Sequence, residues 1–278
     1  QVIPSPADLQ QGIRALGRNQ NEGNPVYLSG EVYPNGHWLY FPLTLALKIP
    51  IAFQILAVLG IGVLALGCFL RILPANRLWL LLPPVLYLLI AMQSSVQLGI
   101  RLIFPALIFF VLITGFAIDF LWRYSSGRIV LAVLLGFLLV STARIFPHDI
   151  SYFNEWAGGP ENGWRYLSDS NIDWGHNLPD LRDYMSRTGV STINLFSFGY
   201  DKLHRYFPPG AIRQMRLPWS PAHVESTVFQ PPPGLYAVHV SLLGGQLFPP
   251  GYRDYLAYFR SRQPIARPGF GIAVYRVP

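Results

Sequence analysis

The side chains that could do chemistry lie in three short polar stretches, and the first of these is aromatic. Glu31 and His37 are the only carboxylate and imidazole groups in residues 30–42. Such a pair could contact a substrate or a metal ion together. Two solvated loop residues are the alternative, and the sequence leaves both interpretations open.

The second stretch carries Arg101, which follows Gly99 in a short loop before a long apolar segment. A guanidinium can donate two parallel N–H groups to a phosphate, which makes Arg101 a candidate ligand for a lipid phosphate. An arginine at this depth can also reach ordinary lipid headgroups while its stem stays in the apolar region. The residue pattern does not favour either role.

The third stretch is rich in Ser, Asp and Asn and contains Asn171, Asp173, Trp174 and His176. Asp173 and His176 are three residues apart, but a metal site needs a further ligand and the spacing supplies none. We expect Asp173 to cap the following helix. The stretch is predicted to be a structured loop with a scaffolding role. No catalytic set is evident, and a divalent metal ion stays open as a cofactor.

Four apolar segments separate these stretches, at residues 49–70, 78–92, 102–122 and 129–146. The first and third contain 22 and 21 residues, and about 20 apolar residues in a helix cross the hydrocarbon layer. The second and fourth need their flanks or some tilt to cross. Pro83 and Pro84 should kink the second. Asp119, near Arg123 at the end of the third, is the only acidic residue within them. The sequence therefore predicts about four membrane spans.

Charge predicts the orientation of these spans. The short loops 71–77 and 123–128 carry two arginines each, which favours a cytoplasmic location for both. The polar regions 1–48, with an interfacial segment near residues 43–49, and 147–278 would then both lie outside a multi-pass cell-membrane protein. A net charge of +7 does not indicate nucleic acid here, because the arginines are scattered and several flank apolar segments near lipid phosphates.

Residues 147–278 have the composition of a soluble domain, with twelve basic and ten acidic side chains. Strands are predicted at 192–198, 235–242 and 271–277, and helices at 178–187 and 252–262. Alternating strands and helices indicate a small α/β domain. The expected fold is an α-helical membrane bundle of about four spans (49–146) followed by a small extracytoplasmic α/β domain.

Several motifs carry a resemblance that covers nearly the whole chain. They are Gly30-Glu31, Trp38-Leu39-Tyr40-Phe41-Pro42, Gly99-Ile100-Arg101, Tyr152-Phe153-Asn154-Glu155 and Ser170-Asn171-Ile172-Asp173-Trp174-Gly175. In their order they resemble the C-terminal half of lipid-carrier-dependent glycosyltransferases, the protein O-mannosyltransferase-like family 39 with the type-C membrane fold. The chain departs from that pattern at His176-Asn177, where the family tends to have Gln-Asp, and at Leu102, where an aromatic residue or His is common.

The resemblance implies transfer of a hexosyl or pentosyl group from a polyprenyl-phosphate donor to a hydroxyl of an acceptor protein or glycan. Arg101 would contact the lipid phosphate, and Glu31, His37, Asn171, Asp173 and Trp174 would be loop contacts. The family's catalytic acidic residue lies in an earlier extracytoplasmic loop, so we expect it outside this chain. The alternative is a non-catalytic membrane subunit whose outer α/β domain binds a partner or carbohydrate.

Overall fold

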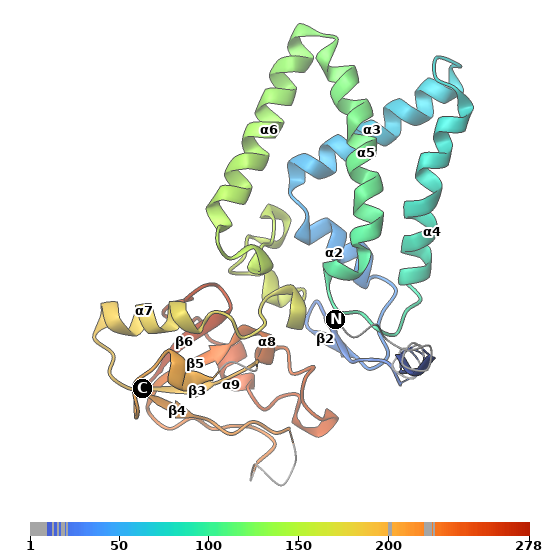
Figure 1. Ribbon diagram of the computed structural model, residues 1–278. Helices are drawn as coiled ribbons and strands as arrows, with labels where there is room; N and C mark the ends of the chain where they lie inside the picture. Colours follow the sequence, from blue (N-terminus) through green and yellow to red (C-terminus); the bar gives the residue numbers. More distant parts are fainter. Residues whose placement is uncertain are drawn as a thin grey trace.

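The computed structural model describes residues 10–278, except residues 13, 16, 18, 19, 21, 200, 201, 220–223 and 225. Helices α3, α4, α5 and α6 extend from one end of the part of the molecule that carries the sheet (Figure 1). A hairpin of β1 (Val26–Leu28) and β2 (Glu31–Tyr33), followed by α2 (Tyr40–Lys48), lies where the two parts meet.

Among the described residues, three helices are long and apolar enough to cross a membrane. They are α3 (Ile51–Phe69), the continuous helix Ile100–Trp122, which ends in α5 (Phe104–Trp122), and α6 (Ser125–Ile145). Many of their large apolar side chains are exposed, as expected of a surface that faces lipid. The predicted apolar bundle is therefore confirmed for three helices by length and composition.

The second predicted span is a shorter helix of mixed type, Ala75–Ala91. Its first seven residues, Ala75–Leu81, form a 3₁₀ helix, and its last ten form α4 (Leu82–Ala91). Pro83 and Pro84 lie in the first turn of α4, where a missing N–H breaks no helical hydrogen bond. The predicted kink is thus a change of helix type. A 3₁₀ residue rises about 2.0 Å and an α-helical residue about 1.5 Å, so the helix is about 29 Å long.

Helix α3 leans across α5 in Figure 1, and a glycine permits the crossing. A Cβ atom added at Gly60 would lie 2.2 Å from the backbone oxygen of Ile113 on α5. Leu56, Ala117 and Leu131 pack together nearby and link α3, α5 and α6. Close approach of backbones through a small residue is a common means of packing helices in lipid.

The sheet has the strand order β4-β3-β5-β6. Strand β3 (Ile193–Phe196) pairs in parallel with β4 (Ile212–Gln214) and β5 (Gly234–His239), and β6 (Ile272–Val277) is antiparallel to β5. Helix α7 (Leu178–Thr188) confirms the predicted helix and ends at Gly189 in the left-handed conformation. The predicted helix at 252–262 is shorter, with α9 at Ala257–Arg260, and β5 gives way to the short helix α8 (Val240–Leu243).

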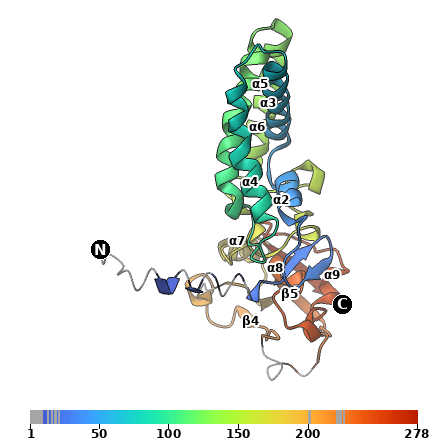
Figure 2. The same ribbon diagram turned by 90° about the vertical axis from the view of Figure 1, so that its right-hand side faces the viewer.

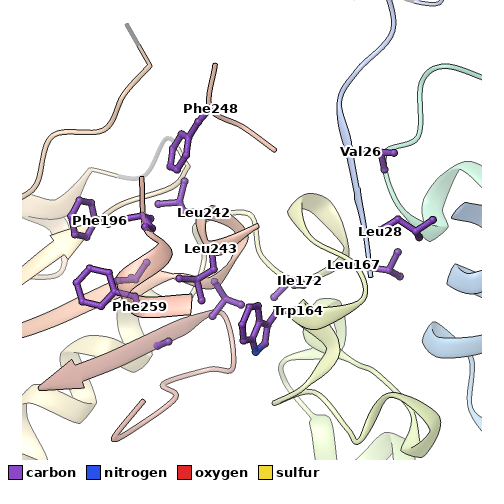
Figure 3. Close-up of a cluster of buried hydrophobic side chains, with 14 of the residues drawn as sticks. Val26, Leu28, Trp164, Leu167, Ile172, Phe196, Leu242, Leu243, Phe248 and Phe259 are labelled. Carbon is purple, nitrogen blue, oxygen red and sulfur yellow. The ribbon is translucent and has the colours of Figure 1, made fainter. Parts of the chain in front are cut away.

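One hydrophobic cluster joins the hairpin, α2 and the sheet. Figure 3 shows it extending from Phe196 of β3 and Phe259 of α9, past Trp164, to Leu28 of β1. The main chain adds a bridge between Leu28 and Leu167. The sequence analysis predicted neither the hairpin nor β4. Apolar side chains of residues 26–48 pack against the sheet in one core. Their partners lie far away in sequence, so this packing arises only when the chain folds.

The two short connections between helices lie at the far end of the bundle from the sheet. Figures 1 and 2 both show the α3–α4 and α5–α6 connections at one end, with the hairpin and the sheet at the other. The arginine-bearing loops are therefore separated from both long polar regions by the length of the bundle.

We predict that Gly60→Ala lowers the unfolding temperature of the protein in detergent, because its methyl group needs space already held by the Ile113 carbonyl. Overpacking of this kind costs about 1–3 kcal/mol. Gly62→Ala is the matched control, since a Cβ there meets nothing within 4 Å. Thermal unfolding followed by circular dichroism compares the two, and equal unfolding temperatures would contradict the close approach.

Candidate functional site

The site is built around the point where α2 ends and the first membrane helix begins. Asn154 donates its side-chain amide to the carbonyls of Ala46 and Ile49, at 2.6 and 2.7 Å. The Gln54 amide reaches the same two oxygens, each at 2.8 Å, and the Asn154 backbone N–H donates to Leu47. The last carbonyls of a helix lack partners within it, and unsatisfied ones are costly beside lipid. These amides therefore make the turn into α3 stable.

Lys48, the last residue of α2, is buried at the same junction. Its Nζ donates to the carbonyls of Ile150 at 2.7 Å and Asn171 at 2.6 Å, and it lies 4.4 Å from the centre of the Phe153 ring. No carboxylate pairs with it among the residues that the structure describes. Burial lowers the pKa of this amine to about 7. The side chain ties α2 to two later loops.

Asn171 carries the connection onward to the loop of Arg101. Its Nδ2 donates to the hydroxyl of Tyr40 at 2.8 Å, and that hydroxyl also accepts the N–H of Gly99 at 2.8 Å. Gly99 has φ +87°, and a Cβ there would lie 3.2 Å from the Asn171 side-chain oxygen. The position therefore requires glycine. Two buried hydrogen bonds to the Tyr40 hydroxyl thus orient the turn that presents Arg101.

Arg101 and Trp174, both exposed, lie face to face. The guanidinium carbon is 4.7 Å from the centre of the indole ring, a cation–π contact between the start of a membrane helix and the loop before α7. Asp169 lies in the same loop: burial raises the pKa of its carboxyl, and the charge of Arg101 opposes part of that rise. The sequence analysis missed Asp169 because only the fold brings it toward a cation.

Asp173 is buried and does not cap α7, so that prediction is wrong. One of its oxygens accepts the N–H of Gly175 at 2.8 Å and lies 3.3 Å from His176. The other bonds to Nδ1 of His239, at the end of β5. A buried carboxylate needs such partners, and His239 lies 66 residues away in sequence. Asp173 and Asn171 thus position the loop, whereas Arg101 and Trp174 are accessible.

Glu31 and His37, the remaining predicted pair, both contact Tyr33. Glu31 accepts a hydrogen bond from the Tyr33 hydroxyl at 2.8 Å, and the His37 ring lies 4.4 Å from the Tyr33 ring. The main chain of His37 exchanges two hydrogen bonds of 2.9 Å with the Gln97 side chain. His37 is therefore held against the loop that precedes Arg101. Within the described part of the chain, no group of three or more His, Cys, Asp or Glu side chains could hold a metal ion.

A cleft of about 1450 Å³ opens beside Trp174. Its walls come largely from residues that follow β3 and β4, so it lies at the carboxyl ends of these parallel strands, where α/β sheets commonly bind ligands. A Cβ on Gly175 would lie 2.4 Å from the carbonyl of Phe198, which shows how closely the Trp174 loop covers the end of β3. Trp174 separates Arg101 from this cleft.

We predict that the free energy of unfolding rises between pH 7 and 9 in the wild type, and that Lys48→Met abolishes this rise. The folded-state pKa of about 7 lies below the ordinary 10.5, so in this window the unfolded chain binds a proton that the folded chain does not. Stability then rises with pH by up to about 1.4 kcal/mol per unit.

Denaturant unfolding in detergent at several pH values gives the slopes. The exposed Lys202 supplies the control, and Lys202→Met should keep the wild-type slope. Identical slopes for the wild type and Lys48→Met would mean that the two carbonyls keep the amine protonated.

Comparisons with protein-family models, with curated proteins and with solved structures give no match.

Proposed function

We propose that this chain provides the lipid-phosphate and acceptor side of a membrane glycosyltransferase. The enzyme would transfer a sugar from a polyprenyl-phosphate donor to an acceptor hydroxyl at the outer membrane face. The observation that carries the proposal is the position of Arg101. It stands at the start of the apolar helix Ile100–Trp122 and stacks on Trp174, which lines the large cleft. A cation at the membrane boundary thus adjoins the cleft.

This arrangement suits a donor that is part lipid and part sugar. The prenyl chain would stay in the bilayer, the phosphate would meet the Arg101 guanidinium, and the sugar would face the cleft. The acceptor hydroxyl would bond to the anomeric carbon as the bond from that carbon to the phosphate oxygen breaks. Neutralising the departing phosphate lowers the barrier to this step. The acceptor's proton would pass to the acidic residue that the resemblance assigns to an earlier loop.

A non-catalytic subunit that binds a partner or carbohydrate is the second candidate. It is favoured by the absence of a carboxylate among the described residues that line the cleft. Both candidates use the same membrane arrangement, and they differ in whether the protein turns over a donor lipid. Release of polyprenyl phosphate by the purified protein, in the presence of donor and acceptor, distinguishes them.

The proposal includes four crossings, with the sheet outside the cell. The helix Ala75–Ala91 supports a fourth crossing, because its length of about 29 Å is close to the roughly 30 Å hydrocarbon layer. Four crossings return the chain to the side where it began. The hairpin and the sheet lie together at one end of the bundle, in agreement with this arrangement.

We predict that Ser186→Cys on α7 reacts with a membrane-impermeant maleimide on intact cells, whereas Ser125→Cys at the start of α6 reacts only after permeabilisation. Both serines are exposed. The background carries Cys68→Ala, which removes the chain's single cysteine. Reaction of both positions from one side would contradict the four-span arrangement.

We predict that Arg101→Ala weakens binding of a short-chain polyprenyl phosphate in detergent about tenfold or more. A charge-assisted hydrogen bond contributes about 1.5–3 kcal/mol, and 1.4 kcal/mol corresponds to tenfold. Arg101→Lys should be intermediate, because it keeps the charge but loses the two-pronged contact and the stacking on Trp174. Arg128→Ala, at the far end of the bundle, is the control. Equal affinities of all four proteins would remove Arg101 from the site.

A further inference from the structure

Among the described residues, the charged side chains that line the cleft beside Trp174 are basic. Lys202 and Arg216 line it with exposed side chains, and His204 and apolar or polar uncharged residues form the rest of the described lining. Neither Lys202 nor Arg216 forms an ion pair within the described part of the chain. Charges of one sign in a concave surface reinforce one another and attract the opposite sign. The cleft therefore favours an anionic ligand.

The same cleft presents two tryptophan rings to solvent. Trp174 is 45% exposed and Trp219 is 49% exposed, although large aromatic side chains usually bury most of their surface. Trp219 is held from behind by Phe248, with ring centroids 5.5 Å apart. The face of an indole ring carries a partial negative charge, and it attracts the weakly positive C–H groups on the face of a sugar ring.

We infer that this cleft binds an anionic oligosaccharide whose sugar rings pack on Trp174 and Trp219 and whose carboxylate or phosphate groups meet Lys202 and Arg216. The choice of carbohydrate over other anions rests on the proposed function, in which this ligand is the acceptor. The position of Trp174 supports the choice, because its ring also contacts Arg101. A ligand that packs on Trp174 therefore has one end beside the proposed donor phosphate.

Single-stranded nucleic acid combines anions and flat rings in a similar way. The proximity of the cleft to the membrane helices argues for the glycan, and the experiment includes the nucleic acid as a competing ligand. An oligogalacturonate hexamer is the anionic probe. A hexamer of galactose with the same linkage is the neutral probe, and an oligothymidylate of six nucleotides is the nucleic-acid probe.

Binding of each probe to the full chain in detergent is measured by calorimetry. We expect the anionic hexamer to bind at least tenfold more tightly than either other probe, with an affinity that falls as salt rises. Trp219→Ala and Arg216→Gln should each weaken it about tenfold. Two matched controls should stay within twofold of the wild type: Trp156→Ala, an exposed tryptophan elsewhere, and Arg213→Gln, an exposed arginine on β4 outside the cleft lining.

The test separates this inference from the proposed function. Trp219→Ala should weaken oligogalacturonate binding but leave polyprenyl phosphate binding within twofold, whereas Arg101→Ala should weaken polyprenyl phosphate binding. If the proposed function is wrong, binding of polyprenyl phosphate will not depend on Arg101. Binding of the anionic hexamer to the cleft can still be observed in that case. Equal binding of the neutral hexamer, tighter binding of the oligothymidylate, or no binding of any probe would each overturn the inference.

Discussion

The structure depends on one constraint, which is the need to satisfy the backbone carbonyls where α2 turns into the first membrane helix. Pro50 supplies no N–H at this turn, and the oxygens of Ala46 and Ile49 lie beside the start of a helix that is long and apolar enough to cross a membrane. Asn154 and Gln54 fill this need with their amides. Asn154 follows the last membrane helix, so its hydrogen bonds to Ala46 and Ile49 also join the end of the bundle to its beginning.

The same junction determines what the site can present. Lys48 is buried and pairs with no carboxylate among the described residues, yet its amine bonds to the main chain at Asn171. The Asn171 side chain reaches Tyr40 and thereby the Gly99 turn. Arg101 is therefore oriented by groups that solvent does not reach. The buried residues thus fix the position of the Gly99 turn, and the exposed side chains of Arg101 and Trp174 remain accessible to a ligand. A binding site gains from this division because its exposed groups lose less freedom when the ligand arrives.

The contact between Arg101 and Trp174 joins two environments with different chemistry. On one side an apolar helix offers a place for a lipid chain, and on the other a basic cleft with aromatic walls offers a place for a polar, anionic molecule. In the proposed function, a donor that crosses from lipid to water and an acceptor that stays in water would meet at this contact. The tryptophan suits the position because its ring can pack against a guanidinium on one face and a sugar on the other.

The sequence by itself determined the apolar bundle, α7 and the three longer strands of the sheet, because long apolar runs, cap residues and β-branched residues act locally. It also indicated Arg101, Asn171, Asp173 and Trp174 as residues of interest. Only the tertiary structure decided that Asp173 pairs with His239, that Gln97 holds His37, and that residues 26–48 belong to the sheet's core. These contacts join residues 60 or more positions apart. Whether a side chain is buried, and which group it pairs with, depends on residues far away in sequence. A local sequence pattern does not contain that information.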